Sequence, residues 1–268
     1  MSLSAQIVDE TDDLIIINKP PFLLVHPTKP RGPITLWDRL NDLLSYELVN
    51  GGQIALINRL DRETSGLLLV TKNKKTARAC SMAMAQGAIH KEYLALLYGW
   101  LTPDEGTVDQ PLLRKGSVEP SKIWLMRGIH PKGAVAQTDF RVEQRITHPV
   151  HGPITVVRCW PRTGRTHQIR VHMASLGHPI IGDKIYGPSE DCYLTFIKKG
   201  WSSELNDQLW LPRHALHSTA LGLEFEGQKY RWDSPLPDDL AEFVCPFSLN
   251  GQGAQAPGLE ATGCRDFV

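Results

Sequence analysis

The most informative part of this chain is the sequence Asn58-Arg59-Leu60-Asp61-Arg62-Glu63-Thr64-Ser65-Gly66-Leu67-Leu68-Leu69-Val70. It places Asp61 between two arginines, before a Thr-Ser-Gly turn and an apolar run. An opposite charge at short range keeps a carboxylate ionised, and an ionised Asp at the mouth of a strand can serve as a nucleophile or an electrostatic anchor. The residues alone leave another interpretation open, in which Asp61 caps a turn and pairs with a neighbouring arginine.

Three further blocks accompany this one and carry a family resemblance. They are Ile17-Asn18-Lys19-Pro20 with Val25-His26, Lys91-Glu92-Tyr93-Leu94-Ala95-Leu96-Leu97-Tyr98-Gly99, and Thr163-Gly164-Arg165-Thr166-His167-Gln168-Ile169-Arg170-Val171-His172-Met173 followed by Gly177-His178-Pro179-Ile180-Ile181-Gly182-Asp183. Together the four blocks resemble the RluA-type RNA pseudouridine synthases, whose central motif is usually written His-Arg-Leu-Asp-x-x-Thr-Ser-Gly-Leu-Leu. The resemblance runs from about residue 14 to the region of residue 234, and four blocks in register make chance a poor explanation.

The resemblance implies an α+β fold, with a mixed and mostly antiparallel sheet, flanking helices and long loops. We expect one catalytic domain over residues 1–248 and a flexible C-terminal tail over 249–268, where Gly, Gln and Ala are frequent. Members of the family often carry a small basic RNA-binding domain ahead of the catalytic one. Residues 1–13 alone precede the first expected strand, so we expect that domain to be absent.

Apolar periodicity and turn residues predict the elements along the chain. Strands are expected at residues 14–18, 53–58, 66–70, 90–98, 134–145, 154–160, 214–222 and 229–232. Helices are expected at 35–49 and 74–86, and a third is expected to begin after a cap at Thr166 and to end before Gly177. The segment 102–131 is rich in Pro, Gly and charge, and we expect loops and a hairpin that form a mobile insertion in contact with substrate.

Composition limits the class of protein. The chain has 268 residues, of which 41% are hydrophobic and 22% charged, as in globular domains with a sizeable core. Residues 1–13 lack the basic start of a secretory signal, and no apolar run reaches the length of a bilayer. Five cysteines without a Cys-x-x-Cys pair fit a reducing compartment and argue against a zinc site or a disulfide framework. We therefore expect a cytoplasmic protein with no membrane partner.

The charge balance is a weak point for a nucleic-acid partner, because the formal net charge is zero. Two runs are basic nonetheless: residues 158–172 hold four arginines and no acid, and residues 72–78 hold three lysines and one arginine. Attraction to phosphate is screened over about 8 Å at physiological salt, so a neutral protein can still have a basic cleft. The alternative is an ordinary solvated face, which the sequence favours for residues 72–78.

The resemblance implies that the chain isomerises uridine to pseudouridine in structured RNA. The reaction breaks the N-glycosidic bond, turns the base and rejoins it through carbon, without a metal or a cofactor. By resemblance Asp61 is the nucleophile, Arg170 its partner and Tyr93 the active-site aromatic residue. We expect Arg170 to hold Asp61 in a bidentate pair and Tyr93 to stack on uracil. From the residues alone, Arg170 would be a helix-surface side chain and Tyr93 a core residue of a strand.

Five further side chains are predicted to contact substrate. In the family, the arginine at the position of Arg59 helps to occupy the place of the extruded base, whose extrusion costs a few kcal/mol of stacking. Arg165 and Lys19 are expected to contact phosphate, and His167 to form a hydrogen-bonding wall or a phosphate contact. Ile169 belongs to the apolar stripe of the same helix and completes this group.

One position departs from the family pattern, because Asn58 stands where the family usually has His. Asn keeps a donor and an acceptor but cannot titrate, so we expect activity to survive. The residues Thr64-Ser65-Gly66 are expected to shape the loop, with Gly66 in an unusual dihedral and the two hydroxyls bonded to backbone.

Two other classes of function stay open. A carboxylate-dependent glycosidase or hydrolase would need a second catalytic acid, for which Glu63 is the only nearby candidate. A non-catalytic RNA-binding module would be expected to have lost its nucleophile, whereas Asp61 is present. For the synthase, we expect a stem-loop substrate, with ribosomal RNA slightly favoured over transfer RNA. We also expect a monomer with no obligate protein partner.

Overall fold

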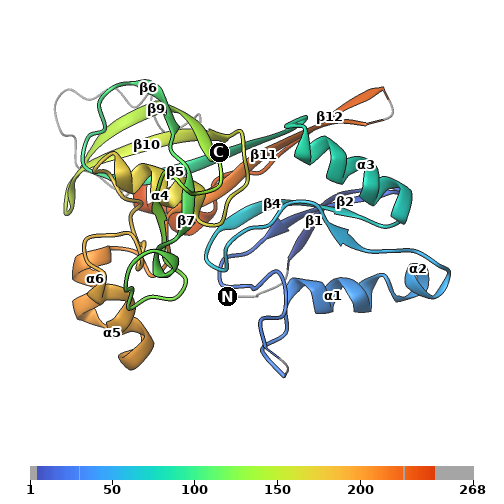
Figure 1. The fold of residues 1–268 in the computed structure, drawn as a ribbon, viewed down its shortest axis with the longest axis horizontal. Coiled ribbons are helices and arrows are strands. Elements are labelled where there is room, and N and C mark those ends of the chain that lie inside the picture. Colours follow the sequence, from blue (N-terminus) through green and yellow to red (C-terminus); the bar gives the residue numbers. More distant parts are fainter. Residues whose placement is uncertain (1–4, 30, 226, 245–268) are drawn as a thin grey trace, which may run out of the picture.

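The computed structural model describes residues 5–29, 31–225 and 227–244. The predicted tail at 249–268 and the end of the predicted domain at 248 lie outside the described residues. Within them, the chain forms a large mixed sheet with helices packed on its faces (Figure 1). All but one of the strand pairings are antiparallel, so the predicted α+β class with a mostly antiparallel sheet is confirmed.

Along the chain, the described residues form both strands and helices. The strands are β1 (Gln6–Glu10), β2 (Leu14–Lys19), β3 (Ala55–Leu56), β4 (Ser65–Thr71), β5 (Ile89–Tyr98), β6 (Glu105–Asp109), β7 (Leu112–Arg114), β8 (Arg127–Ile129), β9 (Gln137–His148), β10 (Gly152–Pro161), β11 (Leu216–Phe225) and β12 (Gln228–Asp233). The helices are α1 (Leu36–Leu43), α2 (Ser45–Val49), α3 (Lys74–Ala85), α4 (Gln168–Ser175), α5 (Asp191–Lys199), α6 (Ser203–Leu209) and α7 (Asp238–Val244), with a 3-10 turn η1 (Lys115–Ser117). The main sheet has the order β1-β2-β4-β11-β5-β10-β9-β6, with β3 beside β4 and β12 beside β11, and β7 and β8 form a separate hairpin.

Several predicted elements differ in extent from the observed ones. The helix predicted at 35–49 is two helices, and the first begins with a capping box between Thr35 and Asp38. The strand predicted at 53–58 shortens to β3, which pairs with β4 over two residues. Thr166 does not cap α4, because His167 stands at the N-cap with φ of 60° and no side chain caps the helix. Residues 102–131 contain the predicted hairpin, β7–β8.

Strands β2 and β4 bury apolar side chains on both faces, and each face meets a different helix. Figure 1 shows α1 and α3 on opposite sides of this part of the sheet. One core contains Ile15, Ile17, Leu68 and Val70 with Leu36 and Leu40 of α1. The other contains Leu14, Ile16, Leu67 and Leu69 with Cys80 of α3. Burial of each large aliphatic side chain contributes about 1.5–3 kcal/mol, so the apolar run after the Asp61 loop becomes a rigid central strand.

The parallel pairing in the described sheet joins β4 to β11 at the centre of the molecule. It comprises two residue pairs, His217 with Ser65 and Ser218 with Gly66. Gly66 has φ of 108°, and a Cβ atom there would overlap the carbonyl oxygen of Ser218, so the close approach of the strands requires glycine. The prediction of an unusual dihedral at Gly66 is confirmed. The loop that precedes β4 therefore ends at the middle of the sheet, next to β11 and one strand from β5.

Candidate active site

The loop between β3 and β4 presents Asp61 with its side chain 27% exposed. Asn58 fixes the start of this loop to β4. Its Nδ2 donates to the carbonyl oxygen of Leu67 at 3.2 Å, and its Oδ1 accepts from the amide of Leu69 at 2.8 Å. The buried amide thus uses both of its polar ends on backbone, which needs no titrating ring at this position. The carboxylate is left accessible on an anchored loop.

Arg170 holds two carboxylates at once. Its Nη1 donates to Oδ2 of Asp61 at 2.7 Å. Its Nε and Nη2 donate to the two oxygens of Asp183 at 2.6 and 2.9 Å. The expected bidentate pair therefore exists, but its partner is Asp183 and not Asp61. Arg170 is buried, which excludes the interpretation of a helix-surface side chain.

The electrostatics of this cluster keep both acids ionised. Burial opposes ionisation of Asp61, yet its pKa falls to about 2 because His167, which is protonated at that acidity, and Arg170 lie beside it. Burial also opposes ionisation of Asp183, and the charge and hydrogen bonds of Arg170 hold the pKa of that carboxyl well below its usual range. The site at neutral pH therefore contains one guanidinium between two carboxylates, of which only Asp61 is open to a ligand.

His167 lies between the start of α4 and Asp61. Its Nε2 is 3.8 Å from Oδ2 of Asp61, and its Nδ1 is 2.7 Å from the hydroxyl of Tyr186. Burial, followed by the charge of Arg170, lowers the pKa of the ring to about 4. His167 is therefore neutral at neutral pH and belongs to the wall of the site, next to the carboxylate.

Tyr93 lies on β5, where it pairs with Ser218 of β11 next to the parallel β4–β11 junction. Its side chain is largely buried. Burial, and to a smaller extent the charge of Asp61, raise the pKa of the phenol to about 12. The structure thus brings Asp61, Tyr93, His167 and Arg170 into one cluster, and the phenol stays protonated at neutral pH.

The two predicted arginines outside this cluster are exposed. Arg59, two residues before Asp61, lies close enough to His26 that its charge, after burial, lowers the pKa of that imidazole. Arg165 lies in the turn before α4, and its Nε donates to the carbonyl oxygen of Val135 at 3.0 Å. Neither arginine forms an ion pair with an acid among the described residues, so both guanidinium groups keep donors that face solvent.

Two other predicted contacts are buried and do not fit their expected roles. Lys19 has no exposed surface, and its ammonium donates to the carbonyl oxygens of Pro20, Leu23 and Arg62. These bonds use all three of its hydrogens, so Lys19 ties the β2–α1 loop to the Asp61 loop and has no donor left for phosphate. Ile169 lies in the main core, where it packs without an open surface.

A second buried network supports the Asp61 loop, and the sequence interpretation missed it. Glu63 accepts from Lys184 at 2.8 and 3.0 Å, and Arg213 donates to the carbonyl oxygen of Glu63 at 3.3 Å. The hydroxyls of the turn contact imidazoles, and the expectation of backbone partners was wrong. Their contacts are Thr64 Oγ1 to His214 Nε2 at 2.7 Å and Ser65 Oγ to His217 Nδ1 at 2.9 Å.

The basic run at 158–172 is largely neutralised by acids on neighbouring strands. Arg158 pairs with Glu92 and Glu143 across the sheet, and Arg162 pairs with Asp139. The acids therefore partly offset the positive charge that these two arginines could offer to RNA. In the other run, Lys72 forms an ion pair with an acid of β1.

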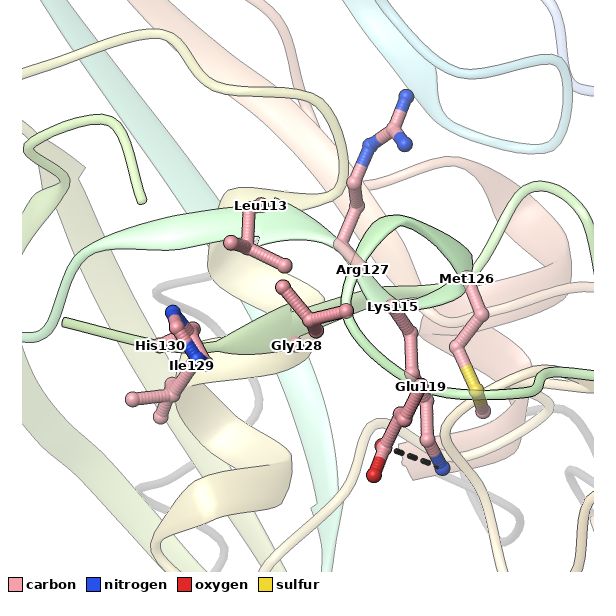
Figure 2. A pocket seen from close by; sticks show the side chains of 9 residues that line it. Leu113, Lys115, Glu119, Met126, Arg127, Gly128, Ile129 and His130 are labelled. Carbon is pink, nitrogen blue, oxygen red and sulfur yellow. Dashed lines mark ion pairs between the residues drawn. The ribbon is translucent and has the colours of Figure 1, made fainter. Parts of the chain in front are cut away.

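Basic side chains gather instead around the β7–β8 hairpin, where Lys122 and Lys132 are exposed and Lys115 is paired with Glu119 and Glu190. Residues 112–132 contain five Lys and Arg residues and one acid. Trp124 is 74% exposed, and the guanidinium of Arg114 lies 3.7 Å from the centre of its ring. An open cavity of about 380 Å³ lies in this hairpin. Figure 2 shows the side chains that line it, with Arg127 directed away from the others. The surface combines an aromatic platform with cations.

No group of three or more His, Cys, Asp or Glu side chains among the described residues is placed to hold a metal ion. In the same part of the chain, every helix is too short or too polar to cross a bilayer. Three buried cysteines in it are free thiols: Cys80, Cys159 and Cys192.

Comparisons with known proteins agree with this geometry. A family model described as RNA pseudouridylate synthase matches residues 13–175. Ribosomal large subunit pseudouridine synthase D of Haemophilus ducreyi is 36% identical over 256 residues, which cover 91% of this chain and 70% of that protein. The protein of the same name from Escherichia coli K12 is 34% identical over 251 residues, which cover 89% of this chain and 69% of that protein.

Solved structures show the same relationship. Human RNA pseudouridylate synthase domain containing 4 matches with a TM-score of 0.67 and 25% identity, over 89% of this chain and 91% of that chain. Human RNA pseudouridylate synthase domain containing 1 matches with a TM-score of 0.64 and 25% identity, over 87% and 84%. The fold, the matched blocks and these relatives agree that the chain belongs to the RNA pseudouridylate synthase family and is an isomerase that acts on RNA.

Proposed function

We propose that the chain isomerises a uridine of large-subunit ribosomal RNA, with Asp61 as the nucleophile that acts on a flipped-out base. The observation that carries the proposal is the state of Asp61: an ionised carboxylate, 27% exposed, oriented by a 2.7 Å bond from a buried guanidinium. The preference for ribosomal RNA is supported by relatives that are named ribosomal large subunit pseudouridine synthase D.

The chemistry needs few protein groups, and the site offers them. The bond between N1 and the sugar carbon C1′ breaks, a bond forms between C5 and C1′, and one proton leaves C5 while N1 gains one. Asp61 supplies a nucleophile that compensates the electron-poor centre left when the base departs. The protonated phenol of Tyr93 lies beside it as an aromatic wall and a proton donor. The isomerisation is redox-neutral, so no cofactor is invoked.

Exposed arginines and the hairpin give the RNA its contacts in this proposal. Arg59 lies next to Asp61 on the same loop, where a guanidinium would replace the stacking that the extruded base loses. Arg165, and Lys122 and Lys132 in and next to the β7–β8 hairpin, face solvent and suit phosphates. The stacked Arg114 and Trp124 provide a surface for an unpaired base.

A glycosidase or hydrolase fits the geometry less well. Such an enzyme places a second carboxyl group across the substrate from the first. Glu63 is engaged by Lys184 at 2.8 Å and is mostly buried, and Asp183 is fully buried against Arg170. Neither acid is free to serve as the partner of Asp61. A binding module without catalysis would not require an open, ionised carboxylate at the centre of the site.

Deletion of the gene in its host, followed by mapping of pseudouridines in ribosomal and transfer RNA, tests the proposal. We expect one or more sites in large-subunit ribosomal RNA to disappear, and to return with the wild-type gene but not with Asp61→Asn. Asp207→Asn, a change of an exposed Asp on α6, is the matched control and should restore the sites. Loss of sites in transfer RNA alone would reject the ribosomal target, and restoration by Asp61→Asn would reject the nucleophile.

A further inference from the structure

We propose that Tyr186 is a positioning residue that fixes the tautomer of His167, so that the Nε2–H of His167 faces Asp61 and the bound uridine. His167 then serves as a neutral hydrogen-bond donor beside the nucleophile. The identity of the acceptor on the substrate rests on the function proposed above. The tautomer itself is a property of the free protein.

The hydrogen bonds of the Tyr186 hydroxyl determine which nitrogen of His167 carries the proton. The backbone N–H of Arg127 donates to this hydroxyl at 2.8 Å, and an amide N–H can only donate. The hydroxyl has one hydrogen of its own, and its other close contact is Nδ1 of His167 at 2.7 Å. If Nδ1 donated as well, the hydrogen of the Tyr186 hydroxyl would have no acceptor among the described residues. Nδ1 therefore accepts this hydrogen, and a neutral imidazole whose Nδ1 accepts carries its proton on Nε2.

The buried carboxylate of Asp183 also fixes the backbone at Tyr186. Oδ1 of Asp183 accepts from the backbone amides of Ile185 and Tyr186 at 2.9 and 3.1 Å. The guanidinium of Arg170 lies 5.1 Å from the centre of the Tyr186 ring, and the ring of His167 meets Tyr186 edge to face at 5.6 Å. The hydroxyl is thus fixed relative to Arg170, and the imidazole has one orientation in which its hydrogen bond is made.

The free nitrogen of His167 is close to the reacting group without being bound to it. Nε2 lies 3.8 Å from Oδ2 of Asp61, which is beyond hydrogen-bond length. Its N–H is therefore available to an oxygen of a substrate that enters next to the carboxylate. Burial and the charge of Arg170 also disfavour a second proton on the ring, which agrees with a donor that stays neutral. An imidazolium would instead pair with Asp61 and weaken it as a nucleophile.

Nitrogen NMR of the protein with ¹⁵N-labelled histidine tests the tautomer directly at neutral pH. His167→Gln assigns the signals of His167 among the ten histidines. In the wild type we expect a protonated Nε2 and an unprotonated Nδ1, and in Tyr186→Phe a mixture of both tautomers. In the same variant kcat should fall about tenfold with KM for RNA unchanged, which is the scale of one neutral hydrogen bond in the transition state.

Tyr230→Phe is the matched control, because its hydroxyl donates one hydrogen bond, to Oε1 of Gln228 at 2.6 Å, on β12 and away from the site. It should keep the His167 tautomer and kcat. A protonated Nδ1 in the wild type, or an unchanged tautomer in Tyr186→Phe, overturns the inference. If Tyr186→Phe does not fold, the wild-type spectrum alone tests the inference: a protonated Nε2 supports it and a protonated Nδ1 overturns it. A wild-type protein inactive on every RNA tested would instead count against the proposed function, and the spectrum would still decide the tautomer.

Discussion

Two loops each bring one carboxylate to Arg170, and the two carboxylates differ in their exposure to solvent and in their hydrogen bonds. The loop that carries the proposed nucleophile, residues 57–64 and called the catalytic loop below, leaves Asp61 27% exposed with one hydrogen bond from the guanidinium. The sealed turn, residues 182–186, buries Asp183 completely and gives it two bonds from Arg170 and two from backbone amides. The same cation therefore has one structural partner and one partner that stays open to a substrate. In the proposed mechanism, Asp183 orients Arg170 and Asp61 is the group that reacts.

Glycine makes the sealed turn possible. Gly182 has φ of 78°, and a Cβ atom there would overlap the carbonyl oxygen of Arg213. The turn therefore packs directly against the segment before β11, and water has no access to Asp183. The catalytic loop has no such cover over its carboxylate. The difference predicts that changes in the two loops separate activity from stability.

The largest effect should come from the open carboxylate. Asp61→Asn should lower kcat by about four orders of magnitude, the scale seen when a nucleophile is removed. The free energy of unfolding should fall by no more than about 2 kcal/mol, the amount that the low pKa of Asp61 implies, because Arg170 keeps its bidentate partner and the amide is isosteric. Single-turnover assays and urea unfolding measure the two quantities. A large loss of stability would show that both loops are structural and would break the comparison.

The sealed carboxylate should behave in the opposite way. Asp183→Asn should destabilise the protein by about 3 kcal/mol, because it removes the anion that compensates a buried guanidinium and weakens the turn. Activity measured well below the melting temperature should fall much less than in Asp61→Asn. Thermal unfolding of the two variants side by side is the measurement. Equal stability of the two would mean that burial does not distinguish the carboxylates.

The buried histidines behind the loops should make stability depend on pH. In the unfolded chain they take up protons near pH 6.5, whereas His167 and His217 do so near pH 4 in the folded protein, mainly because burial lowers their pKa. The unfolded state binds more protons between these values, so stability should fall as pH drops from 6.5 to 4, by about 3 kcal/mol for each histidine. Below pH 4 this contribution stays lost, and the low pKa of Asp61 adds a further loss down to about 2.

Urea unfolding at about pH 7 and about pH 5 measures this dependence. His217→Gln should reduce the difference between the two conditions, because a side chain that cannot titrate takes the place of one buried histidine. His90→Gln, on an exposed histidine of β5, should leave the difference unchanged. Stability that is the same at both pH values would mean that the folded histidines titrate normally.

Asn58 tests how firmly the catalytic loop is attached to the sheet. Asn58→Ala removes the two bonds to the backbone of β4 and leaves a buried carbonyl and amide without partners, at a cost of about 1–3 kcal/mol. Asn58→His introduces the residue usual in the family and should cost less, because a ring can supply one donor and one acceptor. Chemical denaturation of the three proteins gives the order. Equal losses in both variants would show that the amide geometry itself is required.

Much of this site follows from sequence because its main parts lie in contiguous blocks. Asp61 and Gly66 share one loop, and Arg170 follows from the last block by resemblance. The sequence does not show which Asp is the bidentate partner of Arg170. Asp61 and Asp183 have the same side chain, and only the folded structure shows that Asp183 is the buried one. The sole signal for Asp183 was its place at the end of the last block.

Long-range packing explains the other differences. Lys19 looks like a phosphate contact in sequence, but three carbonyl oxygens from two loops surround its ammonium. The hydroxyls of Thr64 and Ser65 face β11 and the segment just before it, about 150 positions away in the chain, so their imidazole partners could not be read from local sequence. The periodicity of apolar residues predicts the strands, whereas tertiary contacts determine the hydrogen-bond partners of the polar side chains.

The smallest effect should come from the exposed end of the catalytic loop. Arg59 faces solvent, so Arg59→Ala should not alter stability measurably. A guanidinium that fills the gap left by an everted base lowers the cost of extrusion, which is a few kcal/mol in a stacked helix and far less in an open loop. Turnover should therefore fall more on a structured RNA than on an exposed loop of the same sequence. Arg78→Ala, on an exposed arginine of α3, controls for the loss of one positive charge. Equal losses on both RNAs would assign Arg59 to phosphate binding. Asp61 would then be the residue of this loop that acts on the base.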